Sequence, residues 1–148
     1  MKLKVTQTIH LSFCIAVLLF STVVFVLNKE NLFFDASLAN SAPFNPLFPI
    51  VSLLGISVGL FLYKKKLSSL SPELTFDEKF MHYQTAFLIR CAFCEGGALL
   101  NVVGCFATNN LFFMVFAGLS FIALLVSRPT KEKVIGDLQL QYPDTEKF

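Results

Sequence analysis

The chain has 148 residues, of which 55% are apolar, and its mean hydropathy of +0.67 argues against a soluble globular domain. The formal net charge is only +2, and membrane topology accounts for the lysine clusters, so we expect no nucleic-acid partner.

Four apolar runs are each close to the length that a helix needs to cross ~30 Å of hydrocarbon. They predict an all-α, polytopic membrane protein with four transmembrane helices in one domain, residues 1–148, that ends in a cytoplasmic tail, 128–148. The predicted spans are residues 10–27, 46–63, 86–106 and 111–127.

The basic residues between these runs are strongly segregated. Ten flank one side of the predicted bundle, whereas Lys29 alone lies on the other. Basic loops stay in the cytoplasm, so both termini and the central loop are predicted to be cytoplasmic. Six of these cations are predicted to contact lipid headgroups: Lys64, Lys65, Lys66, Arg128, Lys131 and Lys133.

The N-terminal segment, residues 1–28, has a basic start and an apolar run of about 17 residues. This run is longer than the core of a typical signal peptide, and no small-x-small cleavage site follows it closely. We therefore expect an uncleaved first helix. In the loop that follows, three prolines at every third position, Pro43, Pro46 and Pro49, predict a stiff, extended approach to the second helix.

The second span contains a pair of glycines, Gly55 and Gly59, with Ser52 nearby. In an apolar helix this spacing lets two backbones approach closely. The approach is either to another helix of the same chain or to a second copy, and the sequence does not separate the two.

Between the second and third spans, Thr75 and Glu78 are spaced as a capping box and predict a helix start near Phe76. The apolar stripe of Phe76, Phe80 and Tyr83 is expected to lie on the membrane surface, as an interfacial extension of the third span. After the fourth span, Val134, Ile135 and Leu138 predict a second interfacial helix, weakened by Gly136.

The third span carries a stripe of small and polar residues on one face. The spacing 4-3-4-3 is that of a helix-packing seam. The stripe consists of Arg90, Cys94, Gly97, Asn101 and Gly104, and one further step of four residues continues it to Thr108.

Three residues form a predicted intramembrane polar site: Arg90, Glu95 and Asn101. An ionisable side chain in a span is costly and suggests function. Glu95 is either protonated, paired with Arg90 through helix deformation or water, or paired with a cation of another subunit. Three roles are open for this carboxylate: it packs the helices together, it carries protons or cations, or it contacts a charged partner protein or lipid.

Cys91 and Cys94 form a C-x-x-C pair, but at membrane depth they are expected to be small packing residues. We predict no metal site and no cofactor. Because no catalytic constellation lies on one membrane face, we also expect the chain not to be an enzyme.

Two resemblances arise at these residues. The residues that carry the first are Ile89-Arg90, Glu95-Gly96 and Ala98-Leu99, with the later segments 128–133 and 137–138. This first resemblance is to small four-helix membrane proteins of Bacteroidota-type bacteria. The likeness covers roughly residues 71–140. Those proteins have no assigned function, although some carry a loose transporter label, and the resemblance implies a multi-pass protein of the bacterial inner membrane.

In the second resemblance, which covers about twenty residues in all, the segment 92–104 is similar to the ion-binding helix of rotary-ATPase proteolipid subunits. That resemblance implies that Glu95 carries an ion. The chain departs from those proteins in its bulky first helix and its long segment 64–84.

The sequence therefore predicts a non-enzymatic inner-membrane protein, a structural or accessory subunit of a membrane assembly or a homo-oligomer. Its partners are lipids and either a second copy or another membrane protein. The alternative is a proton- or cation-coupled translocator that uses Glu95.

Overall fold

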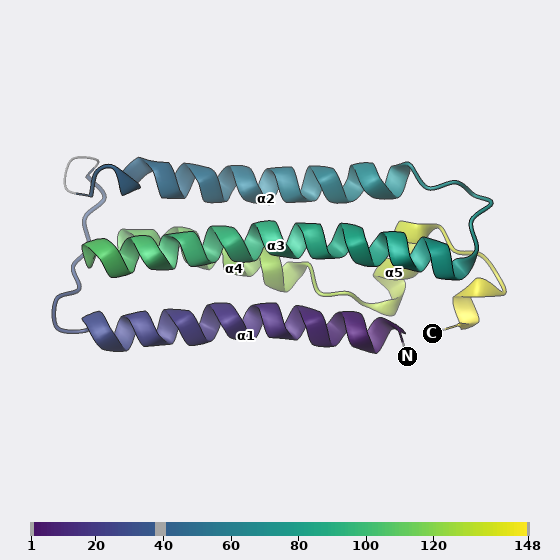
Figure 1. Cartoon of the computed structure of the whole chain (residues 1–148), viewed down its shortest axis with the longest axis horizontal. Coiled ribbons are helices and arrows are strands. Elements are labelled where there is room, and N and C mark those ends of the chain that lie inside the picture. The colour runs from purple at the N-terminus through teal and green to yellow at the C-terminus, as the bar shows by residue number, and fades with distance from the viewer. Residues whose placement is uncertain (1, 38–40, 148) are drawn as a thin grey trace.

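A computed structural model describes residues 2–37 and 41–147 of the chain, and its regular structure is helical (Figure 1). The prediction of an all-α fold is confirmed. An isolated backbone bridge between Phe33 and Asn110 is the only β-type pairing among the described residues. The elements are α1 (Lys2–Asn28), α2 (Phe44–Ser68), α3 (Phe76–Thr108), α4 (Phe112–Val126), α5 (Lys131–Leu138) and a 3₁₀ turn, η1 (Asp144–Glu146).

Three helices, α1, α2 and α3, are long and apolar enough to cross a membrane. With 15 residues, α4 is only about 22 Å long at 1.5 Å per residue, short of the usual span. It meets the length only together with α5, from which it is bent by 79°. The described chain thus has three candidate spans, or four if the bent pair is one span.

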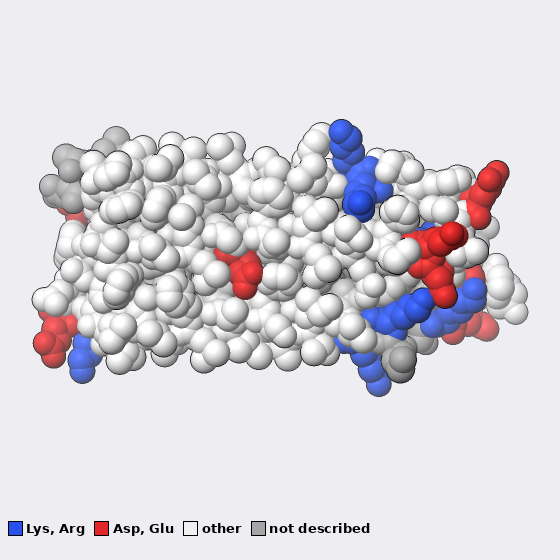
Figure 2. All heavy atoms as spheres, viewed as in Figure 1, with Lys and Arg blue, Asp and Glu red and all other residues white. Residues whose placement is uncertain are grey.

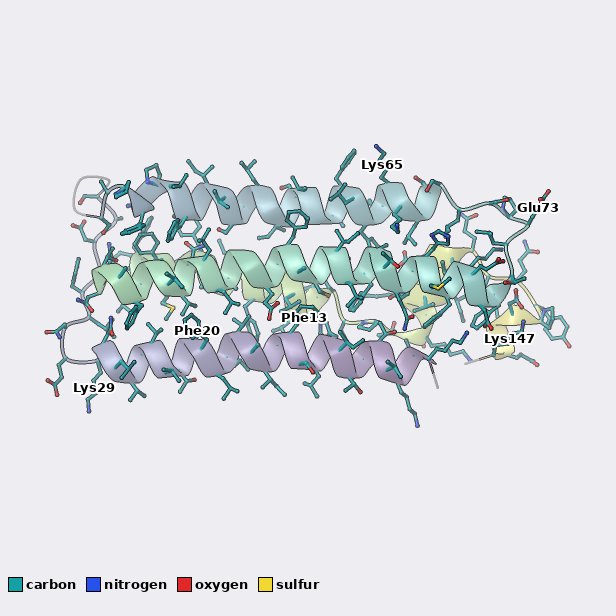
Figure 3. The ribbon with its side chains drawn as sticks, in the orientation of Figure 1. Phe13, Phe20, Lys29, Lys65, Glu73 and Lys147 are labelled. Carbon is teal, nitrogen blue, oxygen red and sulfur yellow. The ribbon has the colours of Figure 1, made fainter. Side chains whose placement is uncertain are left out.

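The long helices lie side by side, and α3 is the central one (Figure 1). It packs against α1, α2 and α4, while α2 also packs against α4. Both chain termini lie at the same end of the bundle (Figure 1). We call this end the basic end, because most Lys and Arg side chains gather towards it (Figure 2). Lys147 lies there, whereas Lys29 lies at the opposite end (Figure 3).

The helices extend beyond the predicted spans. The first begins at Lys2 rather than His10, and the second continues to Ser68 instead of ending at the lysine run. Lysine is a good helix former, and its long side chain reaches water from a position inside a helix. The edge of an apolar run therefore marks where hydrocarbon would end, which need not be where the helix ends.

The predicted start of the third helix is confirmed by a complete capping box. The Thr75 side chain accepts a hydrogen bond from the Glu78 backbone N–H, and the Glu78 carboxylate accepts one from the Thr75 backbone N–H at 2.9 Å. The cap satisfies amides that have no partner within the helix.

The two apolar stripes that the sequence predicts to rest on lipid pack against protein instead. The stripe of α3, Phe76, Phe80 and Tyr83, is at most 7% exposed. It shares one apolar cluster with Val134 and Leu138 of α5, so the tail folds back over the α3 extension. An amphipathic stripe fits protein as well as lipid, and only the tertiary contact between the two segments decides.

At the opposite end, Asn110 holds the long loop to the turn between α3 and α4. Its side chain accepts from the Asp35 N–H and donates to the Asp35 carbonyl and to the Ser41 hydroxyl. The backbone of Phe33 pairs with the same turn. These bonds connect the loop after α1 to the α3–α4 hairpin.

Candidate functional site

The two glycines of α2 lie against α3 of the same chain. A Cβ atom on Gly59 would come within 2.9 Å of the Phe93 Cβ, and one on Gly55 would lie 3.5 Å from the Phe93 carbonyl oxygen. Real Cβ atoms essentially never approach as closely as the first distance. The close approach that the glycines permit is therefore already used within the monomer.

The predicted stripe on α3 faces α2 and α4. A Cβ on Gly97 would lie 3.1 Å from both the Ser120 Oγ and the Ser52 Cβ, and one on Gly104 would lie 2.9 Å from the Phe113 ring. Cys94 in the same stripe is 1% exposed. The seam thus packs between α2, α3 and α4. Little of its surface remains exposed for contact with a second copy of the chain.

Asn101 lies at the centre of this seam and is fully buried. Its amide N–H groups donate to the Gly97 carbonyl at 2.9 Å and to the Phe48 carbonyl at 3.4 Å. Its Oδ1 and the Ser120 Oγ have no hydrogen-bond partner among the described residues. Asn101 therefore links α2 to α3.

Glu95 lies apart from this seam, on the side of α3 that faces α1. It is partly exposed and lies near the Cys14 side chain of α1. Figure 2 shows acidic surface midway along the bundle, in a stretch that otherwise shows no charged side chain, and Glu95 is the only acidic residue in the predicted spans. Within residues 2–37 and 41–147, no hydrogen bond or ion pair reaches its carboxylate.

Arg90 does not pair with Glu95, although it is only five residues away. About 140° separates the two side chains around the axis of an α-helix. The Arg90 guanidinium instead lies over the Tyr63 ring, with its carbon 5.4 Å from the ring centroid. The structure therefore places Arg90, Glu95 and Asn101 in three different environments, and they do not form one polar site.

The sequence analysis missed the partners of Arg90. Tyr63 is 6% exposed and donates from its hydroxyl to the Asp137 carboxylate of α5. Tyr83 packs against it edge to face. A tyrosine at the end of an apolar run is a possible signal, but Asp137 lies 74 residues further along the chain, and no periodicity joins the two.

The four cysteines, Cys14, Cys91, Cys94 and Cys105, are buried free thiols. Among the described residues, no group of three or more His, Cys, Asp or Glu side chains is placed to hold a metal ion. Near Cys14, the His10 ring nitrogen Nε2 lies 2.9 Å from the Leu124 carbonyl oxygen, which ties α1 to α4.

Comparison with known proteins adds no family to this description. No protein family, curated protein sequence or solved structure matches the chain.

Proposed function

We propose that the chain is a non-enzymatic integral protein of the bacterial inner membrane and a structural or accessory subunit of a membrane assembly. It crosses the bilayer four times, with both ends in the cytoplasm. The shared position of the termini and the clustering of cations at that end support this orientation (Figures 1 and 2). For the short α4, local thinning of the bilayer compensates for the missing length.

The observation that carries the proposal is the unpaired, partly exposed carboxylate of Glu95. If the span begins at Ala86, Glu95 lies ~14 Å along the helix at 1.5 Å per residue. A polar group at that depth is costly without a hydrogen-bonding partner. A donor on a helix of another subunit supplies the partner that the described part of this chain lacks.

The glycine seam does not provide this contact, because Gly55, Gly59 and Gly97 pack within the monomer. The outer face of α3 around Glu95 is the surface that also carries an unpaired carboxylate. It includes exposed apolar side chains of α3, such as Leu88, which is 37% exposed and lies two turns before Glu95 on the same helix face. The assembly therefore forms through the Glu95 face rather than through α2.

The test is the mass of the complex extracted in mild detergent, measured by native mass spectrometry. Glu95→Leu removes the hydrogen-bonding group, whereas Glu95→Gln keeps one. An interhelical hydrogen bond contributes about 0.6–2 kcal/mol, so Leu weakens assembly by roughly 3- to 30-fold and Gln by less. Glu30→Gln, at an exposed loop position, is the matched control. A wild-type protein that is only monomeric, with no co-purifying protein, contradicts the proposal.

The same carboxylate also suits a second function, a proton- or cation-coupled translocator in which Glu95 binds the ion. The exposed position at the edge of the bundle favours it, because an ion reaches the carboxylate without passing through the packed seam. Ion flux into proteoliposomes distinguishes the two functions. Glu95→Gln abolishes flux if Glu95 is the carrier, and unchanged flux excludes this role.

A further inference from the structure

A cavity of about 520 Å³ lies at the basic end, between the ends of α2 and α4 and beside α3 and α5. Its size is within the range of small-ligand sites. Leu60 and Val126 form an apolar edge towards the middle of the bundle. The cationic part of the wall consists of Lys64, Arg90 and Lys133, against the single carboxylate of Asp137.

Arg90 is the partly buried cation in this wall. Its guanidinium is partly buried and stacks on Tyr63, but it makes no hydrogen bond or ion pair with any described residue. Its five N–H donors form a planar fork that matches the oxygens of a phosphate. A half-buried fork of this kind, open to a cavity, points to an anionic ligand.

The carboxylate in the wall does not neutralise Arg90. The Asp137 carboxylate accepts a hydrogen bond from the Tyr63 hydroxyl, and this bond links α5 to α2. Lys133 donates to the carbonyls of Val126 and Arg128 at 2.8 and 3.3 Å, which fixes its ammonium beside the end of α4. The cavity therefore keeps an excess of positive charge.

We propose that this cavity binds the phosphate of an anionic phospholipid. Arg90 holds two phosphate oxygens, Lys64 and Lys133 add charge, and the apolar edge at Leu60 and Val126 admits the start of an acyl chain. Basic pockets between helices on the cytoplasmic side of a membrane bind such headgroups. The inference rests on the proposed orientation in the membrane, because only that orientation brings the cavity to the cytoplasmic headgroup layer.

The experiment is native mass spectrometry of the delipidated protein, titrated with phosphatidylglycerol or phosphatidylcholine in neutral detergent. The wild type is expected to bind phosphatidylglycerol about tenfold more tightly. Arg90→Gln removes this preference, and Arg90→Lys restores it in part because the charge returns without the fork. Lys64→Gln, at an exposed position, is expected to reduce it severalfold.

Lys65→Gln is the matched control, since Lys65 is the next residue of α2 and lies outside the cavity, over the Phe61 ring. It is expected to leave the preference unchanged. An equal loss in Lys65→Gln overturns the proposal, as does displacement of the lipid by millimolar inorganic phosphate. Arg90→Gln is also expected to leave the mass of the membrane assembly the same as in the wild type. Loss of lipid binding at this site is therefore distinct from loss of the assembly that Glu95 is proposed to form.

Discussion

Arg90 and Glu95 lie five positions apart on α3 and have different surroundings. Arg90 stacks on an aromatic ring at the basic end, whereas Glu95 faces the edge of the bundle beside α1. The 100° rotation per residue separates them, and this rotation is readable from the sequence. The sequence does not show which ring lies under Arg90, because that depends on how α2 is aligned along α3.

Glycines on α2 and α3 provide a direct test of the seam. Gly59→Ala is expected to destabilise the protein by about 1–3 kcal/mol, because the new Cβ meets the Phe93 Cβ at 2.9 Å. Gly96→Ala is the control, since a Cβ there meets nothing within 4 Å, and its effect stays within about 1 kcal/mol of neutral or stabilises. Thermal unfolding in detergent measures both. Equal effects of the two substitutions contradict the packing.

At the scale of elements, the helix types and the start of α3 were predictable, because caps and apolar runs are local signals. The fold-back of α5 onto α3 was not. Val134 and Leu138 are only 5% exposed or less, but their periodicity equally fits a helix on lipid. The deciding contact joins segments more than 50 residues apart, and no local pattern encodes it.

The cap of α3 is expected to stabilise its first turn. Thr75→Ala removes the side chain that accepts from the Glu78 N–H and costs about 1 kcal/mol. Hydrogen exchange of residues 76–80 is then faster by about fivefold. Thr85→Ala is the control, because Thr85 donates to the Met81 carbonyl inside the helix and caps nothing. If both variants exchange at the wild-type rate, the cap does not stabilise the helix.

A hydrogen bond to α2 adds to the apolar packing that docks α5. Tyr63→Phe keeps the ring under Arg90 but removes the hydroxyl that donates to Asp137. A hydrogen bond to a charged group contributes about 1.5–3 kcal/mol, so amides of residues 131–138 are expected to exchange at least tenfold faster. Tyr142→Phe, at a tyrosine that is 78% exposed, is expected to change nothing. Unchanged exchange in the first variant means that apolar packing alone holds α5.

For the whole molecule, segregation of charge and the even number of helices predicted termini at one end, and the structure has this arrangement (Figure 1). The polar stripe predicted a packing seam on α3, and α3 is the helix that packs against α1, α2 and α4. The short length of α4 was not apparent, because the apolar run 111–127 includes two residues that flank the helix.

The orientation is testable by thiol labelling of intact spheroplasts. Lys29→Cys and Ser37→Cys are expected to react with an impermeant maleimide, whereas Ser69→Cys and Lys147→Cys react only after lysis. The four native thiols are at most 5% exposed and contribute little background. The reverse pattern contradicts the proposed orientation. If only one of Lys29→Cys and Ser37→Cys reacts before lysis, the two positions do not share one side of the membrane, which contradicts the α1–α2 hairpin.

The central claim is that the Glu95 face of α3 contacts another protein within the membrane. Photo-crosslinking in native membranes tests it most directly, with a photoreactive residue replacing Leu99, one turn beyond Glu95, and with Val58 on α2 as the comparison position. We predict a discrete protein adduct from Leu99 that disappears when Glu95→Leu is added, and none from Val58. Adducts with lipid alone at both positions, or a protein adduct that persists without Glu95, contradict the account.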